Sequence, residues 1–461
     1  MKKFFTTLAV VSIASTTLFA QFRPTDKTGI NVFETPKEDT KVEFNGVKVD
    51  FGGGFTQGFQ ALSHSNKAVQ SINADGVDVN RLIPIRPGFN LASANLMINT
   101  HLADGVALKM ELYLASRHHN ETWVKGGYMQ FDKIPFLDID FLDNIMEYTT
   151  LKVGQMEVNY GDAHFRRTDG GNAIYNPFVE NNIIDAFATE IGVEADIQRN
   201  GFIGVLSVTN GLLKGNVVDL DPTYADPDNK STIISKGKNN PTLIVKLGYD
   251  KQLNDQLRLR ATGSVYHNPG AADNTLLAGD RTGSNYFGVM HFAAPGTSYF
   301  TNGRFTPGFT DKITGLMGNL FVKYNGLEWF TTIESLSGRS RVESTGTRNA
   351  TQIATDLVYR FGKNEDFWIG AKYNRVGSEM YQPTDLPALG ASGDLPAFDA
   401  VQKGMYDINI DRLAFSAGWF MTKNVMTKLE YVTQKYDGFK YNSIFSQGEF
   451  NGLVLQAVVG F

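Results

Sequence analysis

Charged side chains of both signs gather in one polar segment of the chain, residues 161–185. Arg166 and Arg167 are adjacent there, whereas the carboxylates are spread along the segment. Fixed charges at a narrow, water-filled constriction discriminate between ions, because low-dielectric walls concentrate the electric field. The segment is therefore a candidate charged constriction, and an equally simple interpretation is a solvated loop whose charges pair with one another. The candidate constriction residues are Arg166, Arg167, Asp169, Glu180 and Asp185.

A second group of charged residues recurs at every other position of apolar stretches. In residues 186–198 the carboxylates share one face, and Ile191, Val193 and Ile197 share the other. A period of two is that of a β-strand with one polar and one apolar face. We expect the polar faces of such strands to line a lumen, and the candidate lumen-facing residues are Glu190, Glu194, Asp196, Arg258, Arg260, Lys246, Lys428 and Glu430.

The connections between the alternating stretches are of two kinds. Asn200-Gly201 and Asn325-Gly326 supply the residues of two-residue hairpin turns, and Asp104-Gly105 marks another short turn. Residues 268–312 and 377–407, in contrast, are long and polar. Tight turns at one rim and long loops at the other are typical of a transmembrane β-barrel.

The alternating stretches predict an all-β fold, a transmembrane antiparallel β-barrel of about 16 strands over residues 47–461. An even number of strands places both chain ends on the periplasmic side, and a barrel of this size encloses an aqueous channel. Residues 132–150 do not alternate well and are expected to form a short helix or turn at the periplasmic rim. The strands are expected to begin at Val47, Phe89, Val106, Trp123, Leu151, Ala186, Phe202, Thr242, Leu257, Thr314, Leu327, Thr351, Phe367, Asn409, Val425 and Glu449.

The two ends of the chain indicate its destination. Residues 1–20 have two lysines followed by a mostly apolar stretch, which predicts a secretory signal peptide. Residues 21–46 are polar and predict an unstructured periplasmic lead-in. The last strand ends on an alternating apolar face that includes Phe461, and it looks like the terminal signature that the barrel-assembly machinery recognises in proteins of the bacterial outer membrane. A formal net charge of −5 gives no indication of nucleic-acid binding.

Together these features resemble bacterial porins. Residues 151–161, LKVGQMEVNYG, lead into a charged third outer loop and are similar to the corresponding segment of the phosphate-selective porin O/P and DcaP-like group. The resemblance implies a passive channel for small hydrophilic solutes or ions in the outer membrane of a Gram-negative bacterium, embedded in lipid and assembled as a homotrimer. It also implies that residues 161–185 form the constriction. The chain lacks an extended arginine ladder, so the resemblance does not extend to phosphate specificity.

Small residues at Ala92, Ala94, Ala186 and Ala188 are candidates for close approach between trimer subunits, although Ala186 and Ala188 lie on the polar face. Gly52, Gly53 and Gly54 predict a bend in the first strand, where another backbone approaches the wall. The adjacent Arg166 and Arg167 are expected to project together into the pore. Their replacement by alanine is then expected to favour cations, whereas replacement of Arg339 and Arg341 is expected to have no effect.

The sequence predicts no cofactor and no metal site. Residues 219–229 are rich in aspartate, but their spacing differs from that of a calcium-binding loop, and a solvated acidic loop is the preferred interpretation. His118 and His119 are expected to form an exposed polar pair. No nucleophile motif is present, so the chain is not expected to be an enzyme. The alternative is a non-conducting barrel, an adhesin, structural protein or hydrolase, that displays residues 268–312 and 377–407.

Overall fold

The computed structural model describes residues 23–37, 44–115, 122–213, 239–279, 283–292, 302–340, 343 and 346–461. The expected signal peptide, His118, His119, residues 219–229 and Arg341 lie outside these ranges. The described chain forms seventeen strands, of which β2 has only two residues. The strands are β1 (Lys48–Ser65), β2 (Gly88–Phe89), β3 (Ser93–Ala103), β4 (Val106–Ala115), β5 (Trp123–Phe131), β6 (Thr149–Glu157), β7 (Thr189–Arg199), β8 (Phe202–Thr209), β9 (Thr242–Gln252), β10 (Leu257–Asn268), β11 (Lys312–Tyr324), β12 (Leu327–Arg339), β13 (Arg348–Phe361), β14 (Phe367–Gln382), β15 (Gly404–Phe420), β16 (Val425–Asp437) and β17 (Glu449–Gly460).

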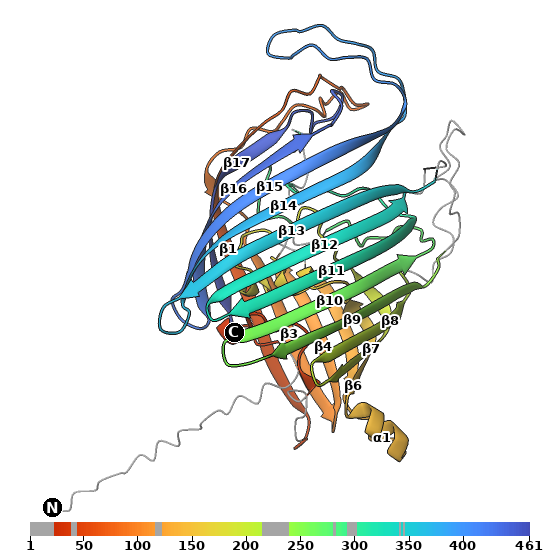
Figure 1. Cartoon of the computed structure of the whole chain (residues 1–461), viewed down its shortest axis with the longest axis vertical. Coiled ribbons are helices and arrows are strands. Elements are labelled where there is room, and N and C mark those ends of the chain that lie inside the picture. The colour runs from red at the N-terminus through yellow and green to blue at the C-terminus, as the bar shows by residue number, and fades with distance from the viewer. Residues whose placement is uncertain are drawn as a thin grey trace, which may run out of the picture.

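The sixteen long strands close into one antiparallel barrel (Figure 1). Each strand pairs with its neighbour along the chain, and β1 closes the ring by pairing with β17 through Gly54–Ser65 and with β3 through Lys48–Thr56. Closure leaves no unpaired sheet edge in the membrane, which is the condition for strands to cross a bilayer. The predicted fold class and the predicted sixteen long strands are confirmed. The seventh strand begins at Thr189, so Ala186 and Ala188 belong to the preceding loop, where Ala188 is buried.

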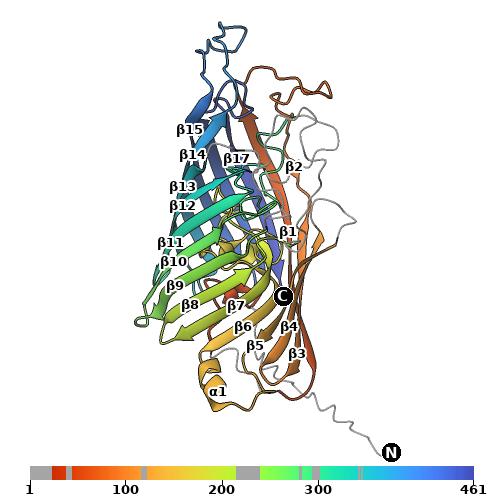
Figure 2. The same ribbon diagram turned by 90° about the vertical axis from the view of Figure 1, so that its right-hand side faces the viewer.

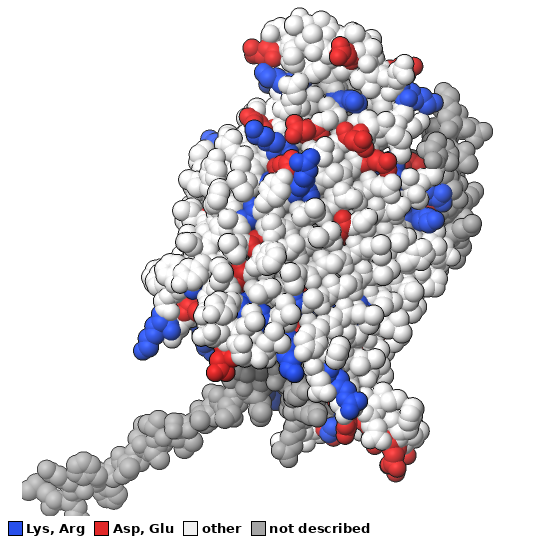
Figure 3. Space-filling model, in the orientation of Figure 1, with Lys and Arg blue, Asp and Glu red and all other residues white. Residues whose placement is uncertain are grey.

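Side chains on the strands alternate between an exposed outer face and a buried inner face. In β13, Ile353, Leu357 and Tyr359 are about half exposed on the outer wall, whereas Gln352 and Val358 are buried inside. Figure 3 shows a largely uncharged outer wall, with most of the visible charges towards its two ends. Near the turns, stacked rings of Tyr359, Phe361, Phe367 and Trp419 form part of an aromatic girdle. These features match a wall that faces lipid.

The short connections have the predicted geometry. Asn200 and Gly201 both have positive φ, 52° and 89°, as does Asn325 at 49°, and this left-handed conformation is the reason for Asn-Gly at such turns. Residues 132–148 include helix α1 (Asp140–Met146), so the expected short helix at the periplasmic rim is confirmed. No helix in the described ranges has the length and apolarity needed to cross a membrane.

Three segments occupy the inside of the barrel. The first is the N-terminal segment (residues 23–37), which contains the 3-10 turn η1 (Lys27–Gly29). The second is loop L3 (residues 158–188), with 3-10 turns η3 (Ala163–Arg166) and η4 (Ala173–Tyr175). The third is loop L5, the described parts of residues 269–311. Each carries fully or nearly fully buried side chains, among them Phe33, Phe178 and Leu276.

Two expectations are corrected by this arrangement. The N-terminal segment is not an unstructured periplasmic lead-in, because its polar side chains find partners on the inner wall. The described part of residues 268–312 is not a displayed outer loop, because it packs on L3: Phe187 N donates to the carbonyl of Leu276, and Phe305 N donates to that of Ile183. The hairpin of residues 383–403 does project outwards, beyond the barrel at the end opposite α1 (Figure 2).

Candidate functional site

Loop L3 is fastened to the inner wall formed by β13–β17. The Lys428 ammonium group donates to three L3 carbonyls, those of Ala173, Asn176 and Phe178, at 3.1, 2.9 and 2.7 Å. Beside it, the Glu430 carboxylate accepts from the backbone N–H of Val179 at 2.8 Å. A non-helical loop inside a barrel exposes backbone polar groups that need partners, and the inward side chains of this wall supply them.

The same wall also presents an apolar surface to L3. Phe178, Ile183 and Ile184 belong to one buried cluster with inward residues of β13–β17. Ile183 N and Ile184 N donate to the side chains of Asn374 and Gln352, at 2.6 and 2.9 Å. L3 is therefore packed against one side of the lumen as a protein core, and the apolar inward residues that share the cluster include Val358, Val376, Ile408, Ile410, Val432, Val454 and Val458.

The glycines of β1 allow the other flank of L3 to approach the wall. A Cβ atom on Gly54 would lie 2.2 Å from the carbonyl oxygen of Gly170 in L3, a distance that no side chain tolerates. The predicted close approach of another backbone at residues 52–54 is thus found at Gly54.

The candidate constriction residues all lie in L3, but each arginine has its own partner. Arg166 contacts Asp356 at 3.2 Å, on the β13 wall, whereas Arg167 forms a two-pronged ion pair with Asp185 at 2.9 and 3.1 Å. The expectation that they project together is therefore wrong. The carboxylates are also divided: Asp169 pairs with Lys125 at 2.8 Å, and Glu180 pairs with Arg304 at 2.9 Å.

Most of these charges are fixed in place by burial and by their partners. Burial raises the pKa of Glu180, but Arg304 and Arg412 outweigh that effect and lower it to about 2. His164 lies between Glu157 and Asn159, at 2.8 and 3.1 Å, and burial lowers its pKa. At neutral pH Glu180 is therefore ionised and His164 is uncharged.

The eight candidate lumen residues all point into the barrel, and seven of them are buried. Lys246 and Arg260 share Asp162 of L3, at 3.1 and 2.8 Å, and Arg258 pairs with Asp250 at 2.7 Å. Glu190 accepts from Tyr266 at 2.6 Å. Glu194 and Asp196 flank Lys152, and Lys428 and Glu430 hold L3.

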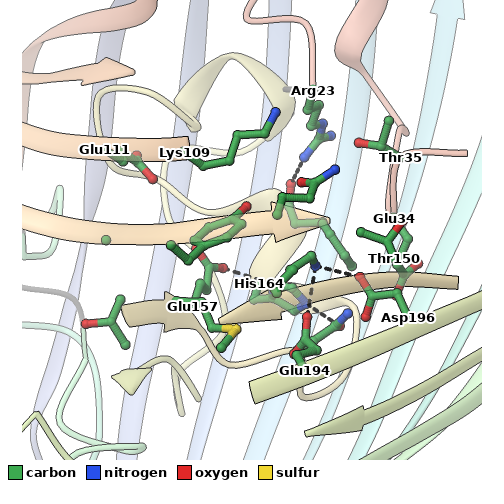
Figure 4. A pocket seen from close by; sticks show the side chains of 18 of the residues that line it. Arg23, Glu34, Thr35, Lys109, Glu111, Thr150, Glu157, His164, Glu194 and Asp196 are labelled. Atoms are coloured by element: carbon green, nitrogen blue, oxygen red, sulfur yellow. Dashed lines mark hydrogen bonds and ion pairs between the residues drawn. The ribbon is translucent and has the colours of Figure 1, made fainter. Parts of the chain in front are cut away.

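A cavity of about 230 Å³ remains between L3, the N-terminal segment and the wall of β3–β7 (Figure 4). Lys125 there contacts Glu111 at 3.0 Å as well as Asp169, and Lys152 contacts Glu194 at 2.9 Å and Asp196 at 2.5 Å. Sequence reasoning missed Lys109, Glu111, Lys125, Lys152 and Glu157, all of which line this cavity. Their signal was available, because Lys109 and Glu111 alternate with the outward Leu108 and Leu112.

Charges of both signs face this cavity, and Lys125 and Lys152 each lie between carboxylates of the wall or of L3. No group of three or more His, Asp or Glu side chains that could hold a metal ion is found in the described part of the chain. The arrangement favours polar solutes and provides fixed charges that can discriminate among them.

Comparison with known proteins gives likeness of fold only. No protein-family model matches the sequence, and neither does any curated protein. Among solved structures, the chain is similar to the outer membrane channel DcaP of Acinetobacter baumannii, with 12% identity over 91% of this chain and 99% of that one, at a TM-score of 0.49. It is also similar to an anion-selective porin from Comamonas acidovorans, with 8% identity over 90% and 100% of the chains and a TM-score of 0.47. A third similar structure is OprB of Pseudomonas putida, with 10% identity over 90% of this chain and 94% of that one, at a TM-score of 0.46.

The class of protein is defined by the barrel itself. Sixteen long strands close around a polar and partly filled lumen, the outer wall is apolar, and the third outer loop folds inside. This is the architecture of a porin-like barrel of the bacterial outer membrane.

Proposed function

We propose that the protein is an outer-membrane porin, a channel for passive diffusion of small hydrophilic solutes or ions. The observation that carries the proposal is the charged cavity left along β3–β7, where L3 and the N-terminal segment do not fill the lumen. L3 is the constriction in this proposal, because it lies inside the lumen and contributes Asp169, the partner of Lys125 on the cavity wall. Phosphate specificity is not part of the proposal, since the cavity's lysines are matched by carboxylates.

Planar-bilayer recording tests the proposal. Purified protein, shown to be folded by its heat-dependent shift in gel mobility, is expected to produce discrete conductance steps in KCl. Folded protein that inserts into the bilayer and stays silent would refute a conducting channel.

The rival function is a non-conducting barrel that binds a ligand through its outer loops. The described part of L5 is folded inside, so the hairpin of residues 383–403 is the described loop that projects furthest for such a role. Deleting residues 385–401 is expected to leave the conductance steps unchanged if the protein is a porin. Loss of a ligand or of a hydrolytic activity on this deletion would instead support the rival.

We also propose that the barrel assembles as a homotrimer. The support is a part of the barrel wall with short strands. Strands β5 and β6 have nine residues each, whereas β14 and β15 have sixteen and seventeen. Ala94, Leu96 and Ile98 lie on the outward face of β3, which only β4 separates from β5, and make that face apolar. Ala186 and Ala188 cannot contribute, because they lie inside in L3. Native mass measurement in detergent is expected to give three chains, and a clean monomer would contradict the proposal.

A further inference from the structure

The N-terminal segment follows the inner wall near the rim that carries the short turns. At its start, the Thr25 hydroxyl donates to the carbonyl of Phe461, and Lys27 N donates to that of Lys423 at 2.7 Å. Asn31 then donates to Glu328 of β12 at 2.5 Å. At its end, the Lys37 ammonium group contacts Asp132 and the carbonyl of Thr149, at 3.0 and 2.9 Å. The segment therefore passes from β17 by way of β12 to β6, most of the way around the barrel.

Glu34 fastens the middle of this path. Its carboxylate accepts from Lys246 of β9 at 2.9 Å and from Arg260 of β10 at 2.6 Å, and all three side chains are almost completely buried. A buried carboxylate with two cationic partners holds its position strongly, because releasing it would leave Asp162 as the one carboxylate that Lys246 and Arg260 share in a low-dielectric site. Lys37 is buried in the same way among oxygen atoms of β6 and the preceding turn.

The segment also supports L3 from the periplasmic side. The ring of Phe33 packs edge-on against Phe165 of L3, with centroids 5.7 Å apart, and Asn31 accepts from Arg166 at 2.9 Å. Arg23 donates to the carbonyl of Phe165 and lies 3.4 Å from the ring centre of Tyr175. The Tyr175 hydroxyl donates to the carbonyl of Pro24 at 2.9 Å. Both 3-10 turns of L3 therefore rest on residues 23–33.

We infer that the N-terminal segment is a second constriction element, which narrows the periplasmic half of the passage and positions L3. Arg23, Glu34 and Thr35 form one side of the cavity along β3–β7 (Figure 4), so whatever passes through that cavity passes this segment. Its effect on conductance rests on the proposed porin function, whereas its position inside the barrel does not. Glu34 and Lys37 are positioning residues, because they act by holding the segment.

Thiol labelling tests the position without any need for conduction, since the chain contains no cysteine. Thr35→Cys is expected to react with a small methanethiosulfonate in the folded protein, but not with a bulky polyethylene-glycol maleimide until the barrel is unfolded. Ala391→Cys, at the exposed tip of the projecting hairpin, is the matched control and is expected to react with both reagents. If Thr35→Cys reacts with the bulky reagent as fast as Ala391→Cys, the segment lies outside the lumen and the inference fails.

Single-channel conductance tests the role of the N-terminal segment as a constriction element. Glu34→Gln with Lys37→Met removes one acid and one base that fasten the segment, and we expect single-channel conductance to rise about twofold as the passage widens. Asp104→Asn with Lys133→Met is the matched control, because it removes an exposed ion pair at the same rim, 2.6 Å long, and should leave conductance unchanged. Equal conductance in both double variants would overturn the role. A silent wild-type protein with a protected Thr35→Cys would refute the porin function while leaving the segment inside the barrel.

Discussion

Two inner walls of the barrel follow the same alternation but carry different side chains. Inward residues of β13–β17 include Val358, Val376 and Val432, which are fully buried beneath the loops. Inward residues of β4–β6 include Lys109, Lys125 and Lys152, which line the cavity. A group of inward valines thus accompanies the wall that L3 covers, where Lys428 and Glu430 are inward as well, and a group of inward lysines accompanies the wall that faces the cavity.

The physical reason is the cost of wetting an apolar lumen wall. Each Å² of apolar surface removed from water contributes about 25 cal/mol, so the valine and isoleucine faces of β13–β17 draw L3 onto them. Lys428, Glu430, Asn374 and Gln352 then satisfy the backbone groups of the docked loop. The cavity remains at the opposite wall, where charged side chains line it.

The largest expected effect comes from Arg166→Ala with Arg167→Ala, which removes the ion pair of Arg166 with Asp356 on the β13 wall and that of Arg167 with Asp185 within L3. Breaking a buried ion pair costs about 3–5 kcal/mol, so we expect a clear fall in the unfolding temperature together with a higher conductance. Asp356 then loses its ion pair with Arg166 and Asp185 keeps only its ion pair with Arg304, which shifts the reversal potential in a KCl gradient towards cations. Arg339→Ala, at a partly exposed ion pair with Asp311, is the control. An unchanged reversal potential and unfolding temperature in the double variant would contradict the assigned partners.

Lys428→Met is expected to have the next largest effect, and it tests the wall of β13–β17 on which L3 packs. Three buried L3 carbonyls lose their donor, and each unsatisfied group costs about 1–3 kcal/mol, so L3 is expected to loosen. Bilayer recordings are expected to show a higher and noisier conductance with little change in ion preference. A quiet channel of wild-type conductance would mean that L3 does not depend on this wall.

Lys152→Met makes the same substitution on the wall of the passage and should act differently. Lys152 contacts Glu194 and Asp196 of the neighbouring strand, and no L3 atom is among its described hydrogen-bond or ion-pair partners. Its removal leaves two carboxylates beside the cavity, so we expect the cation-to-anion permeability ratio to rise about twofold at unchanged conductance. If Lys152→Met and Lys428→Met give the same phenotype, the distinction between the two walls is wrong.

The smallest expected effect is a change of conductance with pH. Burial raises the pKa of Glu34, but Arg260 and Lys246 outweigh it, against a smaller opposing effect of Asp162, and lower it to about 2. A carboxyl with a lowered folded-state pKa contributes stability that is complete above its unfolded value, about 4.3, and is lost as pH falls towards the folded value. Conductance is therefore expected to stay constant from neutral pH to about pH 4.5 and to rise near pH 2–3. In the Glu34→Gln variant this rise of conductance at acid pH should disappear. A rise of equal size in that variant would mean that another group titrates.

The sequence predicted the strands well, because a period of two and Asn-Gly turns are local properties. Inward charges such as Arg260 and Glu194 followed from the same period. What the sequence did not predict is where the long segments go: the N-terminal segment reads as polar and flexible, yet Glu34 and Lys37 meet partners more than 90 residues away. The partners of Arg166 and Arg167 likewise depend on non-local packing. One signal was overlooked, since inward valines on β13–β17 are unexpected for a hydrated lumen and indicate a covered wall.

Cysteine modification during bilayer recording tests the central claim most directly. Met156→Cys places a thiol on the inner face of β6 beside the cavity, and Val376→Cys places one on the inner face of β14 beneath the loops. We predict that a cationic methanethiosulfonate lowers the conductance of Met156→Cys within the recording and leaves Val376→Cys unchanged. Block of Val376→Cys without block of Met156→Cys would contradict a passage along β3–β7.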